Sequence, residues 1–145
     1  MNLAQLPTLF IIHLASTLSL TGLIWFVQIV HYPLLKRVGE DTFAGYHGEH
    51  VRRTSWVVAA PMIVEAVTAV MISLGPPDFI PAWQAWLGLL LVAVIWVSTL
   101  LLQIPAHRRL ERVFLTATHR RLVATNWIRT IAWTLRALLL VLWLT

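Results

Sequence analysis

Histidines stand out among the residues of this chain that could do chemistry, because five of the six occur in or beside two strongly basic segments. Imidazole titrates near neutral pH and ligates transition metals, so such a cluster could bind iron or copper, hold haem, or relay protons. No ligand motif as specific as H-E-x-x-H accompanies it. We predict that a metal, if one is bound, is held by His47, His50 and His119. We also predict that His31, His50 or His107 moves a proton.

Three ionisable residues interrupt otherwise apolar runs, where a charge costs about 2.5 kcal/mol or more. At 1.5 Å per residue, Glu65 lies at a depth between Arg129 and Arg136 and could pair with either. One arginine is then left without an acidic partner. We predict that Arg129 stabilises a phenolate or enolate that develops on a substrate, and that Glu65 sets the charge of the pair. The alternative is that the buried pair only fixes helix register.

Further polar residues form one stripe on each expected helix when they are projected at 100° per residue. Lipid cannot satisfy these groups, so the stripes should face one another inside a bundle. Hydrogen bonding between helices is one use for them, and binding a cofactor or ligand is the other. To binding we assign Gln28, Gln103, Asn126 and Arg136. His13 stands apart and is predicted to be a hydrogen-bonded interior histidine.

The elements that must position these residues are four long apolar runs. The chain has 145 residues, of which 59% are hydrophobic, and no cysteine, which excludes thiol redox chemistry and thiolate metal sites. Each run is long enough to cross a bilayer, and isolated strands cannot span lipid. The sequence therefore predicts an all-α integral membrane four-helix bundle forming a single domain over residues 1–145. Its helices are expected at about 8–30, 55–74, 82–104 and 123–144.

The basic residues predict the orientation of the bundle. Segments 36–54 and 105–122 carry nine of the eleven lysines and arginines, whereas the termini and the proline-rich turn at 75–81 carry none. By the positive-inside rule, both long connections are predicted to be cytoplasmic and both termini outside, in the cell (inner) membrane. The formal charge of +5 then serves orientation and contact with anionic lipid, and we expect no binding of nucleic acid.

A short internal repeat links the two halves of the chain. Residues 28–38 read QIVHYPLLKRV and residues 103–113 read QIPAHRRLERV, so that five of eleven positions coincide. The first stretch begins near the end of the first apolar run, and the second begins near the end of the third. Either a duplicated helical hairpin or similar demands at two equivalent helix ends would produce this similarity.

Two strings in the second half, QIPAHRRL at 103–110 and NWIRT at 126–130, resemble motifs of the anthrone-oxygenase-like family of small four-helix membrane proteins. In that family a polar-Val-Pro-Leu-Asn string closes the third helix and an Asn-x-x-Arg string opens the fourth. His107 stands where the family has asparagine. The resemblance implies the four-helix fold and, because the family includes aromatic polyketide oxygenases, action on aromatic molecules. It singles out Gln103, Pro105, Asn126 and Arg129.

The first half also looks like the HemJ-type protoporphyrinogen oxidases. It shares with them a histidine and a tryptophan in the first helix, then a Tyr-Pro string, and Pro-Met in the second helix. The matching residues are His13, Trp25, Tyr32–Pro33 and Pro61–Met62. This resemblance implies a haem ligand at His13.

The expected function is that of a membrane oxidoreductase or oxygenase that acts on a hydrophobic aromatic or quinone-like small molecule in a polar cavity near the cytoplasmic face. Its cofactor would be haem, iron or copper at the histidine cluster, or none. The alternative is a non-enzymatic membrane subunit, or a lipid- or haem-binding protein. A small proton-coupled carrier is a third reading and would require a homo-oligomer, because four helices enclose little room for alternating access.

Overall fold

The computed structural model describes residues 7–144, which form four helical spans long and apolar enough to cross a membrane. In the first span, α1 (Thr8–Phe26) continues through the π-helix η2 (Val27–His31) into α2 (Tyr32–Leu35). The second span is α3 (Glu40–Leu74) alone. The third consists of α4 (Ala82–Ser98), the π-helix η3 (Thr99–Gln103) and α5 (Ile104–Leu110), and the fourth is α6 (Thr116–Leu144). The predicted all-α membrane bundle is confirmed.

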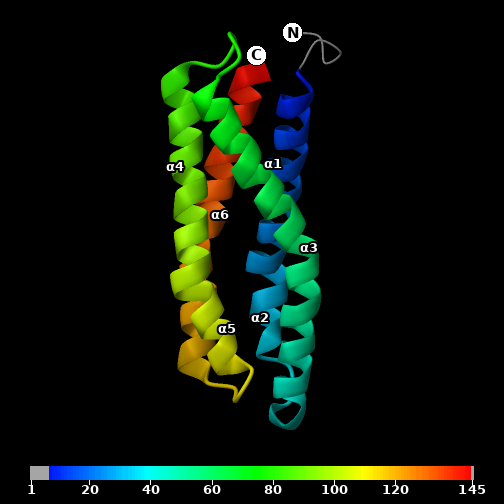
Figure 1. Cartoon of the computed structure of the whole chain (residues 1–145). Coiled ribbons are helices and arrows are strands. Elements are labelled where there is room, and N and C mark those ends of the chain that lie inside the picture. Colours follow the sequence, from blue (N-terminus) through cyan, green and yellow to red (C-terminus); the bar gives the residue numbers. More distant parts are fainter. Residues whose placement is uncertain (1–6, 145) are drawn as a thin grey trace.

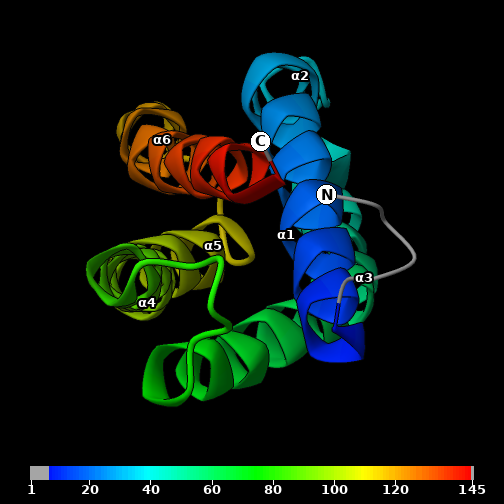
Figure 2. The same ribbon diagram turned by 90° about the horizontal axis from the view of Figure 1, so that it is seen from above.

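The spans run alternately up and down, each packs against its neighbour in sequence, and α6 also packs against α1. Figure 2 shows the resulting ring of helices from above. The start of α1, the end of α6 and the loop at 75–81 lie at one end of the bundle, here called the turn end (Figure 1). The short loops at 36–39 and 111–115 lie at the other, here called the histidine end.

The predicted helix ends are wrong at the histidine end. The segments 36–54 and 105–122, expected to be connections, are mostly helical, so that α3 starts 15 residues before the predicted position 55 and α6 starts at Thr116. The helix ends were predicted from the ends of the apolar runs. A charged stretch ends an apolar run, but the helix can continue through it. Because of this extension, the histidines lie on rigid helices.

Both odd-numbered spans contain a π-helix just before a proline. Gln28 lies in η2 and Gln103 in η3, and Pro33 and Pro105 follow in the first turn of α2 and α5. Proline has no N–H to donate, so the regular bonding pattern must change nearby, and a π-turn is one such change. The order of elements is therefore the same in both halves, as the short sequence repeat suggested: long helix, π-helix, short helix, long helix.

The helix α3 packs against α1 and bends part-way along its length, so that its turn-end half leans toward α4 (Figure 1). Pro61 lies inside this helix and accounts for the bend, because its ring clashes with the preceding turn. The bend leaves α3 and the α4–α5 region apart at the histidine end. The side chains that line this space form the cavity described below.

Candidate functional site

A buried ion pair lies in the middle of the bundle, between Glu65 on α3 and Arg136 on α6. Arg136 Nε lies 2.9 Å from Glu65 Oε1, and the two side chains are 2% and 1% exposed. Glu65 also accepts hydrogen bonds from Thr17 Oγ1 at 2.8 Å and Trp133 Nε1 at 3.0 Å. Arg136 donates in addition to the carbonyl oxygen of Gly88 on α4. This network connects all four spans, and nearly all of its donors and acceptors are used.

His13 completes the network from α1. Its Nε2 accepts from Arg136 Nη2 at 3.1 Å, and its Nδ1 lies 2.7 Å from Thr68 Oγ1, which itself donates to the carbonyl of Val64. This pattern needs a neutral imidazole with its hydrogen on Nδ1. The prediction of a hydrogen-bonded interior histidine is confirmed. Since both ring nitrogens are engaged, the surroundings of His13 do not fit an axial haem ligand.

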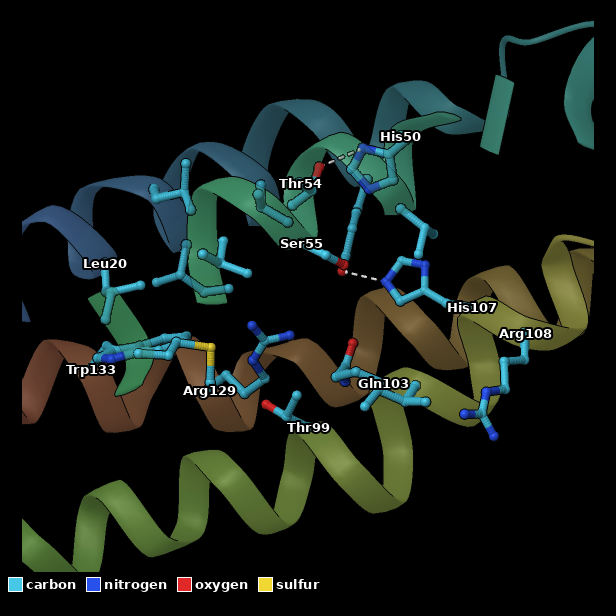
Figure 3. Close-up of a pocket in the computed structure, with 18 of the residues that line it drawn as sticks. Leu20, His50, Thr54, Ser55, Thr99, Gln103, His107, Arg108, Arg129 and Trp133 are labelled. Atoms are coloured by element: carbon cyan, nitrogen blue, oxygen red, sulfur yellow. Dashed lines mark hydrogen bonds between the residues drawn. The ribbon is translucent and has the colours of Figure 1, made fainter. Parts of the chain in front are cut away.

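A cavity of about 360 Å³, within the range of small-molecule sites, lies between the spans toward the histidine end. Its walls are mainly apolar and come from all four spans. Figure 3 shows Leu20 and Trp133 at one end of the cavity, His50 and His107 at the other, and Arg129 and Gln103 between them. The apolar lining residues are Leu20, Leu23, Ile24, Val27, Val51, Val58, Met62, Ile104 and Trp133, and the polar ones are Tyr32, His50, Thr54, Ser55, Thr99, Gln103, His107, Arg108, Glu111 and Arg129.

Arg129 is the arginine that Glu65 does not neutralise. It is 8% exposed, it lines the cavity, and no carboxylate of residues 7–144 forms an ion pair with it. Its guanidinium lies over the ring of Trp133, 5.2 Å from the centroid, and interacts with the Tyr32 hydroxyl. Its Nε is buried with no hydrogen-bond partner in the described part of the chain. An unpaired cation facing an apolar cavity is costly, and an anionic or strongly polar ligand would offset the cost.

Gln103 adds an unused acceptor to the same cavity. Its Nε2 donates to Thr125 Oγ1 at 3.0 Å, but its Oε1 is buried and has no partner within residues 7–144. Most buried polar atoms in proteins are hydrogen-bonded, so an unpaired acceptor on a residue that lines a cavity favours a water or ligand partner.

Other residues predicted to bind or catalyse lie outside this cavity. Glu65 and Arg136 belong to the closed network, although Trp133 connects that network to the cavity wall. Gln28 and Asn126 bond each other, with Asn126 Nδ2 donating to Gln28 Oε1 at 2.8 Å, and neither lines the cavity. These four residues are positioned to join helices.

Four histidines gather at the end of the cavity. The rings of His31 and His50 are stacked with centroids 4.2 Å apart, and those of His47 and His107 with centroids 5.1 Å apart. His50 and His107 line the main cavity, whereas His31 lies beside a second space of about 200 Å³ that His50 also lines. His119 is separate, because its Nε2 donates to the carbonyl oxygen of Tyr32 at 2.8 Å.

The predicted metal ligands do not come together as one set. His119 has its Nε2 occupied, and within residues 7–144 no group of three or more histidine or acidic side chains is arranged to hold a metal ion. His50 Nδ1 is also engaged, at 3.0 Å from Thr54 Oγ1. The three histidines therefore do not fit the iron or copper site that was expected at His47, His50 and His119.

Tyr32 is the cavity residue that the sequence interpretation missed. Its hydroxyl lies 2.9 Å from His107 Nε2, and its side chain is 4% exposed. The internal repeat contained a usable signal, because aligning residues 28–38 with 103–113 places Tyr32 opposite His107. The two residues are in contact in the structure.

Comparisons with protein-family models, with curated proteins and with solved structures found no match to this chain.

Proposed function

We propose that this membrane protein is an oxidoreductase or oxygenase that acts on a hydrophobic aromatic or quinone-like molecule bound in the cavity. The observation that carries the proposal is the buried Arg129, which lines the cavity together with Gln103 and has no ionic partner within residues 7–144. An apolar pocket with a few convergent polar groups is the usual form of a small-molecule site. Its polar atoms fit a phenolic or quinone oxygen, and its walls fit the ring.

The chemistry follows from the charge of Arg129. A guanidinium fixed beside a phenolic oxygen stabilises the phenolate, and in a dry site such stabilisation is stronger than in water. Phenolates and enolates give electrons to an acceptor such as molecular oxygen more readily than the neutral molecules do. Histidines at the same end of the cavity would accept the proton.

The test uses 2-hydroxyanthraquinone, which is both a quinone and a phenol, with the purified protein in mild detergent. Trp133 lines the cavity, so binding should quench part of the tryptophan fluorescence in a saturable way. Arg129→Gln should weaken the affinity by about 10- to 150-fold, which corresponds to about 1.5–3 kcal/mol for a charged hydrogen bond. The matched control is Arg109→Gln, which removes the same charge from an exposed site on α5.

Unchanged saturable quenching in a folded Arg129→Gln variant would contradict the assignment of Arg129. No saturable quenching in the wild-type protein would favour the non-enzymatic alternative, a membrane subunit in which the polar residues only join helices.

A further inference from the structure

Three side chains from three helices form a hydrogen-bonded chain that leads away from the cavity. It starts at Tyr32 on α2, whose hydroxyl lies 2.9 Å from His107 Nε2 on α5. It continues from His107 Nδ1 to His47 Nε2 on α3, at 3.0 Å. His47 is fully buried, and its Nδ1 has no hydrogen-bond partner among residues 7–144. The chain thus connects a cavity-lining phenol to an imidazole that does not line the cavity.

The donors and acceptors in this chain can be assigned from its first member. Arg129 has only donors and interacts with the Tyr32 hydroxyl, so we assign the hydroxyl oxygen to the Arg129 side and its hydrogen to His107 Nε2. A neutral His107 that accepts at Nε2 carries its hydrogen on Nδ1 and donates it to His47 Nε2. By the same reasoning, neutral His47 carries its hydrogen on Nδ1. Both bonds then point in one direction, from Tyr32 toward His47.

We infer that Tyr32, His107 and His47 form a proton relay that takes the hydroxyl proton of a bound phenol to His47. In one concerted shift, the ligand O–H bond breaks and its proton joins the Tyr32 oxygen. The Tyr32 proton moves to His107 Nε2, and the Nδ1 proton of His107 moves to His47 Nε2. The products are a phenolate beside Arg129 and an imidazolium at His47, while Tyr32 and His107 are neutral again. No electron is transferred in this step.

Phe43 favours an imidazolium at His47, whereas burial and the nearby His31 and His119 oppose it and lower the pKa of His47 to about 4. The ring of Phe43 stacks on it with centroids 5.2 Å apart, and its other near neighbours are the imidazoles of His50 and His107. A cation is stabilised over an aromatic face, so Phe43 favours the imidazolium once it forms. Of the three hydrogen-bonded residues, Tyr32 is the one that touches the ligand, and His107 and His47 act through it.

This inference rests on the proposed binding of a phenolic molecule, so the experiment reads binding and proton transfer separately. Fluorescence quenching reports binding of 2-hydroxyanthraquinone. Its visible absorption, which moves to longer wavelength when the hydroxyl ionises, reports loss of the proton. Protein labelled with ¹⁵N-histidine reports by NMR which ring nitrogen carries hydrogen, with His47 and His107 assigned through single substitutions.

The variant is Tyr32→Phe, which removes only the hydroxyl, and the control is Tyr46→Phe, which changes the chain's other tyrosine at an exposed site on α3. At a pH where the probe in empty micelles is mostly neutral, we expect bound probe to be ionised in the wild type and in Tyr46→Phe. His47 should then show two protonated nitrogens. In Tyr32→Phe the probe should bind about 2- to 13-fold more weakly, because one hydrogen bond to the ligand is lost, and bound probe should ionise after rapid mixing at a rate lower by about tenfold or more.

Equal rates of ionisation of bound probe in Tyr32→Phe and wild type would overturn the relay and leave the proposed function intact. Absence of saturable binding would overturn the proposed function instead. In ligand-free protein, hydrogen on Nδ1 of both His107 and His47 supports the relay, and hydrogen on Nε2 of either overturns it, whatever the probe does.

Discussion

The two buried arginines of α6 should respond to the same substitution in opposite ways. Arg136→Gln removes the partner of Glu65 and leaves a carboxylate that is 1% exposed. Hydrogen bonds between membrane helices are worth about 0.6 kcal/mol each, so the bonds from Arg136 to Glu65, Gly88 and His13 account for about 2 kcal/mol. The stranded carboxylate brings the expected loss of unfolding free energy to about 3–5 kcal/mol, as for other broken buried pairs.

Arg129→Gln removes a buried charge that has no ionic partner. A central arginine costs about 2.5–3.5 kcal/mol in a membrane helix, and its contact with the Trp133 ring returns only about 0.5–2 kcal/mol. We therefore expect this variant to unfold with an unchanged free energy, or one up to about 2 kcal/mol higher. A residue that lowers stability is retained when function requires it.

The assay is titration of each variant in mild detergent with sodium dodecyl sulfate, following helix content by circular dichroism. The double variant Glu65→Gln with Arg136→Gln closes a mutant cycle, and removing both charges should recover at least half of the loss caused by Arg136→Gln. The reasoning would be refuted if Arg129→Gln destabilised the protein as much as Arg136→Gln does. It would equally be refuted if the double variant were no more stable than Arg136→Gln alone.

Two further outcomes are expected. Val58→Phe should fill the cavity and weaken binding by at least about tenfold. The control Val67→Phe changes an outward-pointing residue of the same helix and should leave binding unchanged. Equal affinities of the two variants would mean that the ligand binds elsewhere. Thr68→Val should lower the unfolding free energy by about 1 kcal/mol through loss of the bond from His13 and leave binding unchanged, and weaker binding would mean that this network shapes the cavity.

The sequence was sufficient to predict the fold. Each apolar run is long enough to cross a bilayer, and because isolated strands cannot span lipid, four runs of this length can only be helices. The sequence could place Glu65 between two arginines but could not choose between them. The choice depends on how α3 and α6 are rotated about their axes, and that rotation follows from packing along the whole span. The structure pairs Glu65 with Arg136, which leaves Arg129 as the unmatched charge.

The site was harder to predict because hydrogen-bond partners on different helices determine it. His119 and His107 both look like candidate ligands in the sequence, yet one binds a backbone carbonyl and the other binds Tyr32 and His47. Tyr32 precedes a proline and carries no charge, so residue type alone did not single it out. Only the comparison of the two repeats could have paired it with His107.

The length of α3 places the cavity and the histidines at different depths. Its 35 residues extend about 52 Å at 1.5 Å per residue, whereas a bilayer's hydrocarbon core is about 30 Å thick. Measured from Leu74, the core ends near Thr54, beside the cavity, and His47 lies about 10 Å farther on, at headgroup level. A ligand in the cavity therefore lies at the depth of the acyl chains, while the proton that it gives up moves to a histidine at the depth of the headgroups.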